Sequence, residues 1–122
     1  MDELIILPSE DTPYIIFKNS GELSVSGISI PENVNNFYKP VFDWLETFVD
    51  SNNEVLLTFD IEYMNTSSTR VVLQMINKIK NTIQDNSTLK IFWKYEIDDV
   101  DMLELGEDLQ ESSHVTFDFM SK

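Results

Sequence analysis

Residues 55–70, VLLTFDIEYMNTSSTR, contain a strand, a polar turn and the start of a helix in direct succession. Up to Tyr63, apolar residues alternate with Thr58, Asp60 and Glu62, which is the period of a half-buried strand. Beyond the turn, apolar residues recur every three or four positions, as on one face of a helix. That face consists of Val72, Ile76, Ile79 and Ile83, widened by Leu73. The stretch therefore predicts a strand over 55–63 that is followed, after the turn, by an amphipathic helix.

The turn itself carries Asn65, Thr66, Ser67 and Ser68, followed by Thr69. Such residues are favoured before a helix because their side-chain oxygens accept hydrogen bonds from its unpaired first N–H groups. One oxygen is enough for capping, and this turn offers several. A hydroxyl at a helix N-terminus also lies where the helix dipole and the free N–H groups favour an added phosphate. Two interpretations follow, a simple cap and a phosphorylation switch.

The chain before residue 55 predicts a hairpin followed by a helix. Residues 14–18, YIIFK, form one short strand, and residues 23–27, in which Leu23, Val25 and Gly27 alternate with serines, form the next. They are joined by Asn19-Ser20-Gly21, a typical hairpin turn. Proline in IPEN, residues 30–33, ends the second strand because it cannot donate a hydrogen bond to a sheet. Pro40 then lies either in the first turn of the helix or at a kink. The buried stripe of this helix is Phe37, Val41, Leu45 and Phe48, with Trp44 and Val49 beside it. The polar residues 50–53 end the helix, and residues 1–11 form either an arm or a short edge strand.

After residue 83, the pattern predicts a turn at 85–87, a strand, a short helix over 98–109 and a last strand. Inward positions of the helix are Met102, either Leu105 or Gly106, and Leu109. His114 is expected to be a solvated turn residue. In the first of these strands Leu89, Ile91, Trp93 and Tyr95 alternate with lysines, and in the last Val115, Phe117 and Phe119 alternate with polar residues. The residues expected in one core between sheet and helices are Phe59, Ile61, Val72, Ile76 and Trp93.

The order of elements is strand–strand–helix–strand–helix–strand–helix–strand. Strands separated by helices pair in parallel, whereas the opening hairpin is antiparallel, so we expect a mixed sheet. Because the strands alternate in polarity, the helices are expected mainly on one face. A length of 122 residues suits one domain, so the prediction is a single α/β domain over residues 1–122.

The charge balance excludes several classes of partner. The chain has 22 acidic and 8 basic residues, a net charge of -14, so binding to nucleic acid or to a membrane surface is not expected. A partner with a basic patch is favoured instead. There is no Cys, residues 1–8 lack the features of a signal peptide, and no apolar run reaches the length of a membrane span. We therefore expect a cytoplasmic protein.

The sequence offers little catalytic chemistry. Three glycines stand in no phosphate-binding pattern, and one His without Cys is too few ligands for zinc. Eight carboxylates between Glu96 and Glu111 permit a small enzyme dependent on a divalent metal, but charge runs are usually solvated faces. We therefore predict no catalytic residue, metal or cofactor, and interpret this run as an acidic docking surface. A purely structural adaptor is a further alternative.

Several short motifs, taken in order, resemble the SiaC family of bacterial regulatory phosphoproteins, whose fold is similar to STAS domains and anti-sigma-factor antagonists. The resemblance spans nearly the whole chain. Its motifs are Thr12-Pro13, GISIPEN at 27–33 with Phe37-Tyr38, Trp44-Leu45-Glu46, YMNTSS at 63–68, Trp93-Lys94-Tyr95 with Asp98-Asp99, and ELGE at 104–107.

This resemblance implies a STAS-like fold and a switch without catalytic activity of its own. It implies that Thr66 is phosphorylated by a Ser/Thr kinase and restored by a PP2C-type phosphatase. It also implies that the unphosphorylated form binds and activates a diguanylate cyclase, in control of cyclic di-GMP and biofilm formation. The alternative partner is an anti-sigma factor. The switch turn is Asn65, Thr66, Ser67 and Ser68, and possible docking residues are Glu32, Asn33, Tyr63, Asp98 and Asp99.

Overall fold

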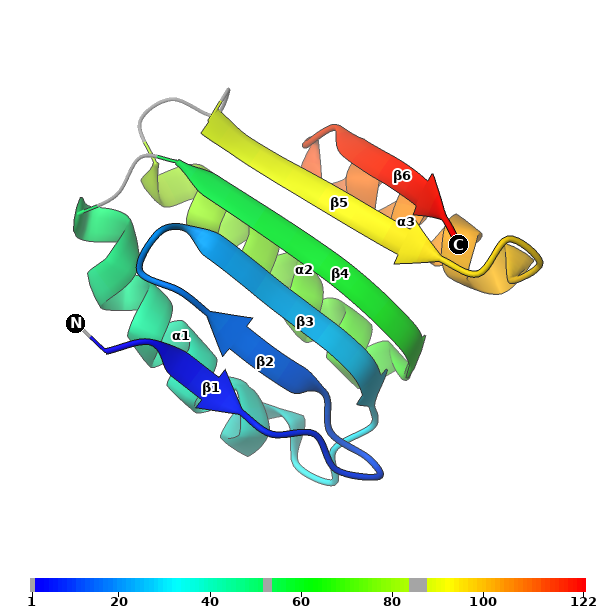
Figure 1. The fold of residues 1–122 in the computed structure, drawn as a ribbon, viewed down its shortest axis with the longest axis horizontal. Coiled ribbons are helices and arrows are strands. Elements are labelled where there is room, and N and C mark those ends of the chain that lie inside the picture. Colours follow the sequence, from blue (N-terminus) through cyan, green and yellow to red (C-terminus); the bar gives the residue numbers. More distant parts are fainter. Residues whose placement is uncertain (1, 52–53, 84–87) are drawn as a thin grey trace.

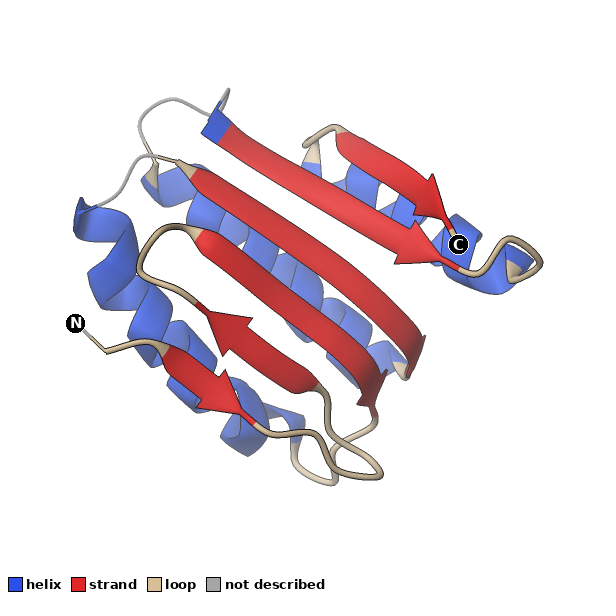
Figure 2. Cartoon of the chain, viewed as in Figure 1, coloured by secondary structure: helices blue, strands red, loops and turns tan. Residues whose placement is uncertain are grey.

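The computed structural model describes residues 2–51, 54–83 and 88–122. These residues form a mixed sheet of six strands in sequential order, and the three helices all lie behind it in the view of Figures 1 and 2. The elements are β1 (Leu4–Ile6), β2 (Tyr14–Phe17), β3 (Glu22–Ser29), α1 (Val34–Ser51), β4 (Val55–Met64), α2 (Thr66–Thr82), β5 (Leu89–Tyr95), α3 (Val100–Ser113) and β6 (Phe117–Ser121).

The pairing confirms the predicted mixed sheet. Strands β1, β2 and β3 are antiparallel neighbours, whereas β3, β4, β5 and β6 pair in parallel. The sequence left residues 1–11 as an arm or an edge strand, and the structure places edge strand β1 there. The chain before β1 is also held by the Trp44 indole, which donates a hydrogen bond to the Asp2 carbonyl at 2.7 Å. The turn predicted at 85–87 lies outside the described residues, as do residues 52 and 53.

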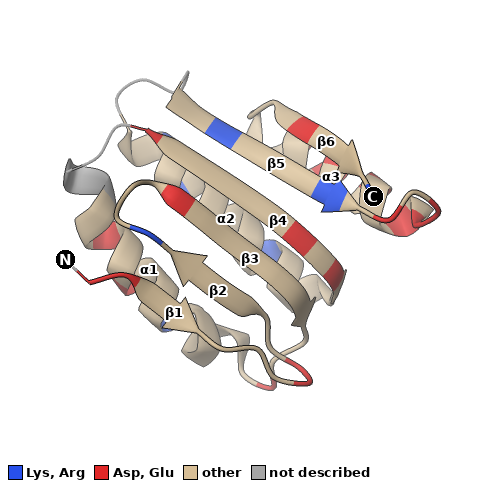
Figure 3. Ribbon diagram, viewed as in Figure 1, with Lys and Arg blue, Asp and Glu red and all other residues tan. Residues whose placement is uncertain are grey.

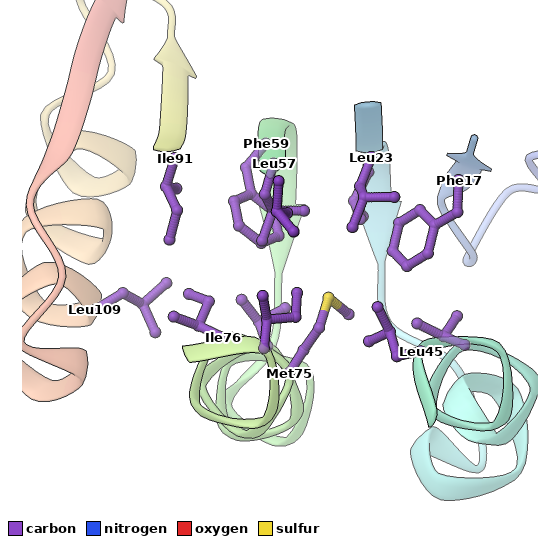
Figure 4. Close-up of a cluster of buried hydrophobic side chains, with 14 of the residues drawn as sticks. Phe17, Leu23, Leu45, Leu57, Phe59, Met75, Ile76, Ile91 and Leu109 are labelled. Atoms are coloured by element: carbon purple, nitrogen blue, oxygen red, sulfur yellow. The ribbon is translucent and has the colours of Figure 1, made fainter. Parts of the chain in front are cut away.

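One hydrophobic core fills the space between the sheet and the helices. The inward residues of β4 alternate as predicted from Val55 to Ile61, and the predicted core residues Phe59, Ile61, Val72, Ile76 and Trp93 all belong to this cluster. Figure 4 shows side chains from the strands pointing towards those of the helices. The placement of the helices on one face of the sheet is therefore confirmed, and the opposite face is uncovered by any helix of the described chain.

Helix α1 differs from its prediction in two details. Tyr38, with 1% of its surface exposed, is part of the buried stripe with Val41, Leu45 and Phe48, whereas Phe37 is only half-buried. Pro40 lies in the second helical turn because α1 begins at Val34. The first-turn placement is therefore wrong, and the carbonyl of Asn36 lacks the helical N–H partner that residue 40 would normally supply.

The other helices also refine the predicted faces. In α2 the buried stripe is widened by Val71 and Met75 instead of Leu73, which is half-buried on the side of α3. In α3 the alternative at 105 or 106 resolves to Gly106. A Cβ atom there would come within 2.5 Å of the Trp93 ring, so the helix packs closely on that side chain. Trp93 also donates its indole N–H to the Met102 carbonyl at 3.0 Å.

None of the helices in the described part of the chain has both the length and the apolar character needed to cross a membrane. The extent of the domain, predicted as 1–122, stays a prediction.

Replacing Ile76 with Ala tests the register of α2. Ile76 is completely buried, so its truncation should lower the free energy of unfolding by about 2 to 5 kcal/mol through lost burial and a new cavity. Urea denaturation measures this change. Gln74→Ala, an exposed position of the same helix, is the control and should cost less than about 0.5 kcal/mol. A similar small cost for Ile76→Ala would contradict the described register.

Candidate functional site

A β-bulge at the end of β4 turns Tyr63 outwards. Gly27 of β3 pairs with Ile61, but the next residue, Ile28, pairs with Tyr63, so Glu62 is an extra residue in β4. The extra residue reverses the in-and-out alternation beyond it. Tyr63 is consequently 56% exposed, so the alternation that was expected to extend to Tyr63 breaks at this residue. Gly27 has a φ of 100°, which a glycine adopts at little cost, and an isolated glycine inside a strand pattern is a signal of a bulge.

Asn65 is the N-cap of α2, as the capping interpretation requires. Its backbone is extended, and its Oδ1 accepts a hydrogen bond from the Ser68 N–H at 2.9 Å. The Asn65 N–H in turn donates to the Ser29 carbonyl at 3.3 Å, which joins the turn to the end of β3. A single side chain therefore supplies the cap, and the hydroxyl groups that follow it are not needed for capping.

The four hydroxyl groups after Asn65 have different environments. Ser67 donates to Asn65 Oδ1 at 3.1 Å, and Thr69 donates to the Asn65 carbonyl at 3.0 Å. Ser68 is completely buried and accepts a hydrogen bond inside the protein. Thr66 is exposed at the first position of α2, and its hydroxyl has no hydrogen-bond partner among the described residues. Of these hydroxyls, that of Thr66 is the one freely available to another protein.

Beneath the turn, three buried hydroxyl groups form a chain that sequence reasoning did not identify. Ser29 contacts the Tyr38 hydroxyl at 2.7 Å and donates to Ser68 at 2.9 Å. Burial raises the pKa of Tyr38, against the smaller opposing effect of its hydrogen bond to Ser29. All three residues belong to the motifs in which the chain resembles the SiaC family, which was the one hint in the sequence. Their spacing along the chain gave no indication that the three side chains meet.

Arg70 is the only arginine of the chain and lies one helical turn after Thr66. Both residues line a cavity of about 240 Å³ between α2 and α3, whose wall also includes Leu73, Asp108 and Leu109. Within the described ranges, Arg70 forms no ion pair, despite the strongly acidic composition. A cation is thus available on the same helix face as the free hydroxyl, with the Asp108 carboxylate opposite.

An acidic cleft of about 350 Å³ opens next to the bulge. It forms because β5 pairs with β4 only as far as Phe59 and Trp93, while β4 continues to Met64. Its walls include residues 60–62 of β4, together with Glu96 and Asp99. Figure 3 shows acidic residues in the C-terminal part of β4 and in the segment after β5.

The ammonium group of Lys122 spans this cleft. It bonds to the Asp60 carboxylate and lies 3.7 Å from Glu96. The hydrogen bond to Asp60, together with the charges of Asp60 and Glu96, raises the pKa of Lys122 despite a small loss of hydration. Because these groups are substantially exposed, the bridge contributes little to stability.

The structure places the predicted docking residues at the carboxyl ends of the parallel strands. Glu32 is exposed between β3 and α1, and Asn33 caps α1 by accepting a hydrogen bond from the Asn36 N–H at 3.0 Å. Asp98 is exposed after β5, and Asp99 caps α3 through the Met102 N–H at 3.1 Å. Both Asn33 and Asp99 therefore have structural tasks independent of docking.

The carboxylates of α3 face solvent. Asp101, Glu104, Glu107, Asp108 and Glu111 are all exposed, and within residues 2–51, 54–83 and 88–122 no group of three His, Asp or Glu side chains is placed to hold a metal ion. His114 is an exposed, left-handed residue at the end of α3, as expected for a solvated turn.

Comparison with known proteins gives a consistent result over almost the whole chain. The profile of the family described as SiaC family regulatory phosphoprotein matches residues 6–122. An uncharacterised protein of Pseudomonas aeruginosa strain UCBPP-PA14 is 29% identical over 119 residues, covering 96% of this chain and 94% of that protein.

Solved structures agree with this match. The crystal structure of apo-SiaC from Pseudomonas aeruginosa superposes with a TM-score of 0.90 at 28% identity, covering 99% of this chain and 100% of that one. A chain in the crystal structure of the diguanylate cyclase SiaD in complex with its activator SiaC, from the same organism, gives a TM-score of 0.89 at 26% identity. That match covers 98% of this chain and 99% of the other.

Replacing Asn65 with Ala should lower the free energy of unfolding by about 0.5 to 2 kcal/mol, because the Ser68 N–H loses its cap. Thr66→Ala, one residue later, removes a hydroxyl without a partner and should change stability by less than about 0.5 kcal/mol. Chemical denaturation of both variants measures the difference. Equal costs would show that the assignment of the cap to Asn65 is wrong.

Proposed function

The chain belongs to the SiaC family of regulatory phosphoproteins, and from this premise we propose that it binds and activates a diguanylate cyclase and is released by phosphorylation of Thr66. The observation that supports the partner is the likeness, over nearly all of both chains, to a chain in the SiaD–SiaC complex. The protein acts by binding, without a reaction of its own, in the cytoplasm, where the ATP used by a kinase is present.

Thr66 is the residue that best fits a kinase substrate. A kinase must reach the hydroxyl of its target, and the Thr66 hydroxyl is exposed and free of internal hydrogen bonds in the described structure. Ser68 would have to leave the core first, since it is fully buried. Ser67 and Thr69 would have to give up hydrogen bonds to Asn65. The local geometry therefore favours Thr66 over its neighbours.

A phosphate on Thr66 is compatible with the fold. It adds about -1.5 to -2 charge at pH 7. This charge lies at the N-terminus of α2, where the helix dipole and the free N–H groups favour it. Arg70, one turn further along, is the nearest cation of the helix and is not engaged in another ion pair of the described chain. The Asp108 carboxylate across the cavity opposes the phosphate, so the net effect on stability is small.

The partner surface includes the exposed ends of β3 and β4 and the segment after β5. Exposed apolar side chains lie at these positions, namely Ile30, Tyr63 and Ile97, among the carboxylates of Glu32, Glu62 and Asp98. An aromatic residue at the centre of an interface often contributes much of the binding energy, whereas surrounding charges mainly steer association. This arrangement fits a partner whose contact surface combines apolar anchors with basic residues.

The function is tested by recovering the partner and measuring its activity. A pull-down from the source cell should recover a diguanylate cyclase, and adding the unphosphorylated protein to that purified cyclase should raise its production of cyclic di-GMP. The proposal is wrong if the cyclase is neither bound nor stimulated. Recovery of an anti-sigma factor in place of a cyclase would assign the protein to a different signalling pathway.

Phosphorylation of Thr66 should weaken cyclase binding by about 2 kcal/mol or more, roughly thirtyfold in Kd, because the partner must desolvate the new charge. Thr66→Glu should do the same to a smaller extent while changing stability by less than about 1 kcal/mol. Thr66→Ala should bind but resist the kinase. Titration calorimetry with kinase-treated protein, checked by intact mass, measures the effect.

The control for added charge is Gln74→Glu, an exposed position two turns further along α2, which should bind the cyclase normally. Unchanged binding by protein phosphorylated at Thr66 would remove the switch. Phosphate found on Ser67, Ser68 or Thr69 would retain the turn but move the modified residue.

A further inference from the structure

Three hydroxyl-bearing side chains are fully enclosed beneath the switch turn. Ser29 and Ser68 have no exposed surface, and Tyr38 has 1%. They come from three different elements: the end of β3, the second turn of α1 and the first turn of α2. No side-chain oxygen or nitrogen buried in the described residues lacks a hydrogen-bond partner, so each hydroxyl of this chain has at least one partner.

The direction of the hydrogen bonds follows from the number of protons. Each hydroxyl has one proton to donate, and Ser29 donates its proton to Ser68 at 2.9 Å. Tyr38 must therefore be the donor in its 2.7 Å contact with Ser29. A phenol carries its proton at neutral pH, and burial raises the pKa of Tyr38 further. The chain thus runs from Tyr38 through Ser29 to Ser68 with a defined polarity.

Ser29 holds the switch turn from two sides. Its carbonyl accepts the Asn65 N–H, while its hydroxyl donates to Ser68, whose own N–H is bonded to the Asn65 side chain. Thr66 lies between these two anchor points. On the other side of Ser29, the chain continues directly into Ile30, Pro31 and Glu32, the loop at the proposed partner surface. One serine is therefore bonded to the turn and covalently joined to that loop.

Stability alone is a weak reason for such an arrangement. A buried hydroxyl loses its hydration, and the net gain from one internal hydrogen bond is small. An apolar cluster of the same shape would be about as stable. Apolar contacts have no preferred direction, whereas a hydrogen bond has a preferred distance and angle. Hydrogen bonds therefore fix the relative position of the groups that they join.

We propose that Ser29, Tyr38 and Ser68 are positioning residues. They hold the Thr66 side chain at the N-terminus of α2 and fix its position relative to residues 30–32, the loop at the proposed partner surface. This inference rests on the proposed function for its biological consequence. Its structural part, the control of the Thr66 position by the hydroxyl chain, is independent of any partner.

The absence of cysteine from the sequence provides a direct reporter. Thr66→Cys introduces a unique thiol at the first position of α2, and the pKa of a thiol is lowered when it is held at a helix N-terminus. Ultraviolet absorbance against pH measures this value. The same measurement is made after adding Ser68→Ala, which removes one end of the chain. It is repeated after adding Tyr38→Phe, which removes the other end while keeping the ring.

Both additions should raise the thiol pKa towards the free value of about 8.5, because the side chain is no longer held against the helix N-terminus. Ile79→Val, a buried substitution in the same helix without a hydroxyl, is the control for lost packing and should leave the thiol pKa unchanged. Circular dichroism shows which variants remain folded, and either network variant is sufficient if the other does not fold. An unchanged thiol pKa, or an equal rise in the control, would overturn the proposal.

A second measurement tests the consequence for binding. In the chain with Thr66 intact, Ser68→Ala and Tyr38→Phe should weaken binding to the purified diguanylate cyclase by at least about fivefold, whereas Ile79→Val should not. If the unmodified protein binds no cyclase, the proposed function fails, but the thiol measurement still decides the positioning role. If the cyclase binds all variants equally, the link between the hydroxyl chain and partner binding is overturned.

Discussion

The parallel pairing of β3 with β4 is the constraint on which the candidate site depends. The two strands pair along the full length of β3, with one register shift between Gly27 and Ile28 that moves the last residues of β4 by one position. That shift places Tyr63 outside and Met64 inside, and it brings Ser29 opposite Met64. Asn65 then bonds to the Ser29 carbonyl, so the start of α2 is fixed by the end of β3. Without the bulge, Tyr63 would compete for space in the core and the turn would begin elsewhere.

The elements and most of the core were predictable because each depends on a local pattern. Alternation in β4 and the spacing of Val72, Ile76 and Ile79 require only nearby residues, and the structure agrees with both. The sequence leaves a choice open, or misleads, where a group distant in the chain decides. Leu105 and Gly106 cannot be distinguished by spacing, yet the Trp93 ring leaves room only for glycine.

The candidate site was likewise predictable only where local sequence patterns decide its structure. The polar turn and its place at a helix N-terminus were predictable, because capping residues indicate where a helix begins. The different roles of its hydroxyls were not, because the burial of Ser68 depends on Ser29 and Tyr38, which are far away in the sequence. The outward direction of Tyr63 depends on the strand next to it, although Gly27 offered a partial signal.

The geometry also explains why a phosphate at this position would act on the partner more than on the fold. A negative charge at a helix N-terminus is stabilising by about 0.3 to 1 kcal/mol, and it would enter water at the exposed Thr66 without displacing a buried group. At an interface centre, the same charge costs about 2 kcal/mol or more because it must lose its water. Ser68, only two residues away, has the opposite properties, since a phosphate there would break the hydroxyl chain and open the core. A turn that buries one hydroxyl and exposes another thus separates the residue that maintains the structure from the residue that we propose is phosphorylated, and a switch needs both.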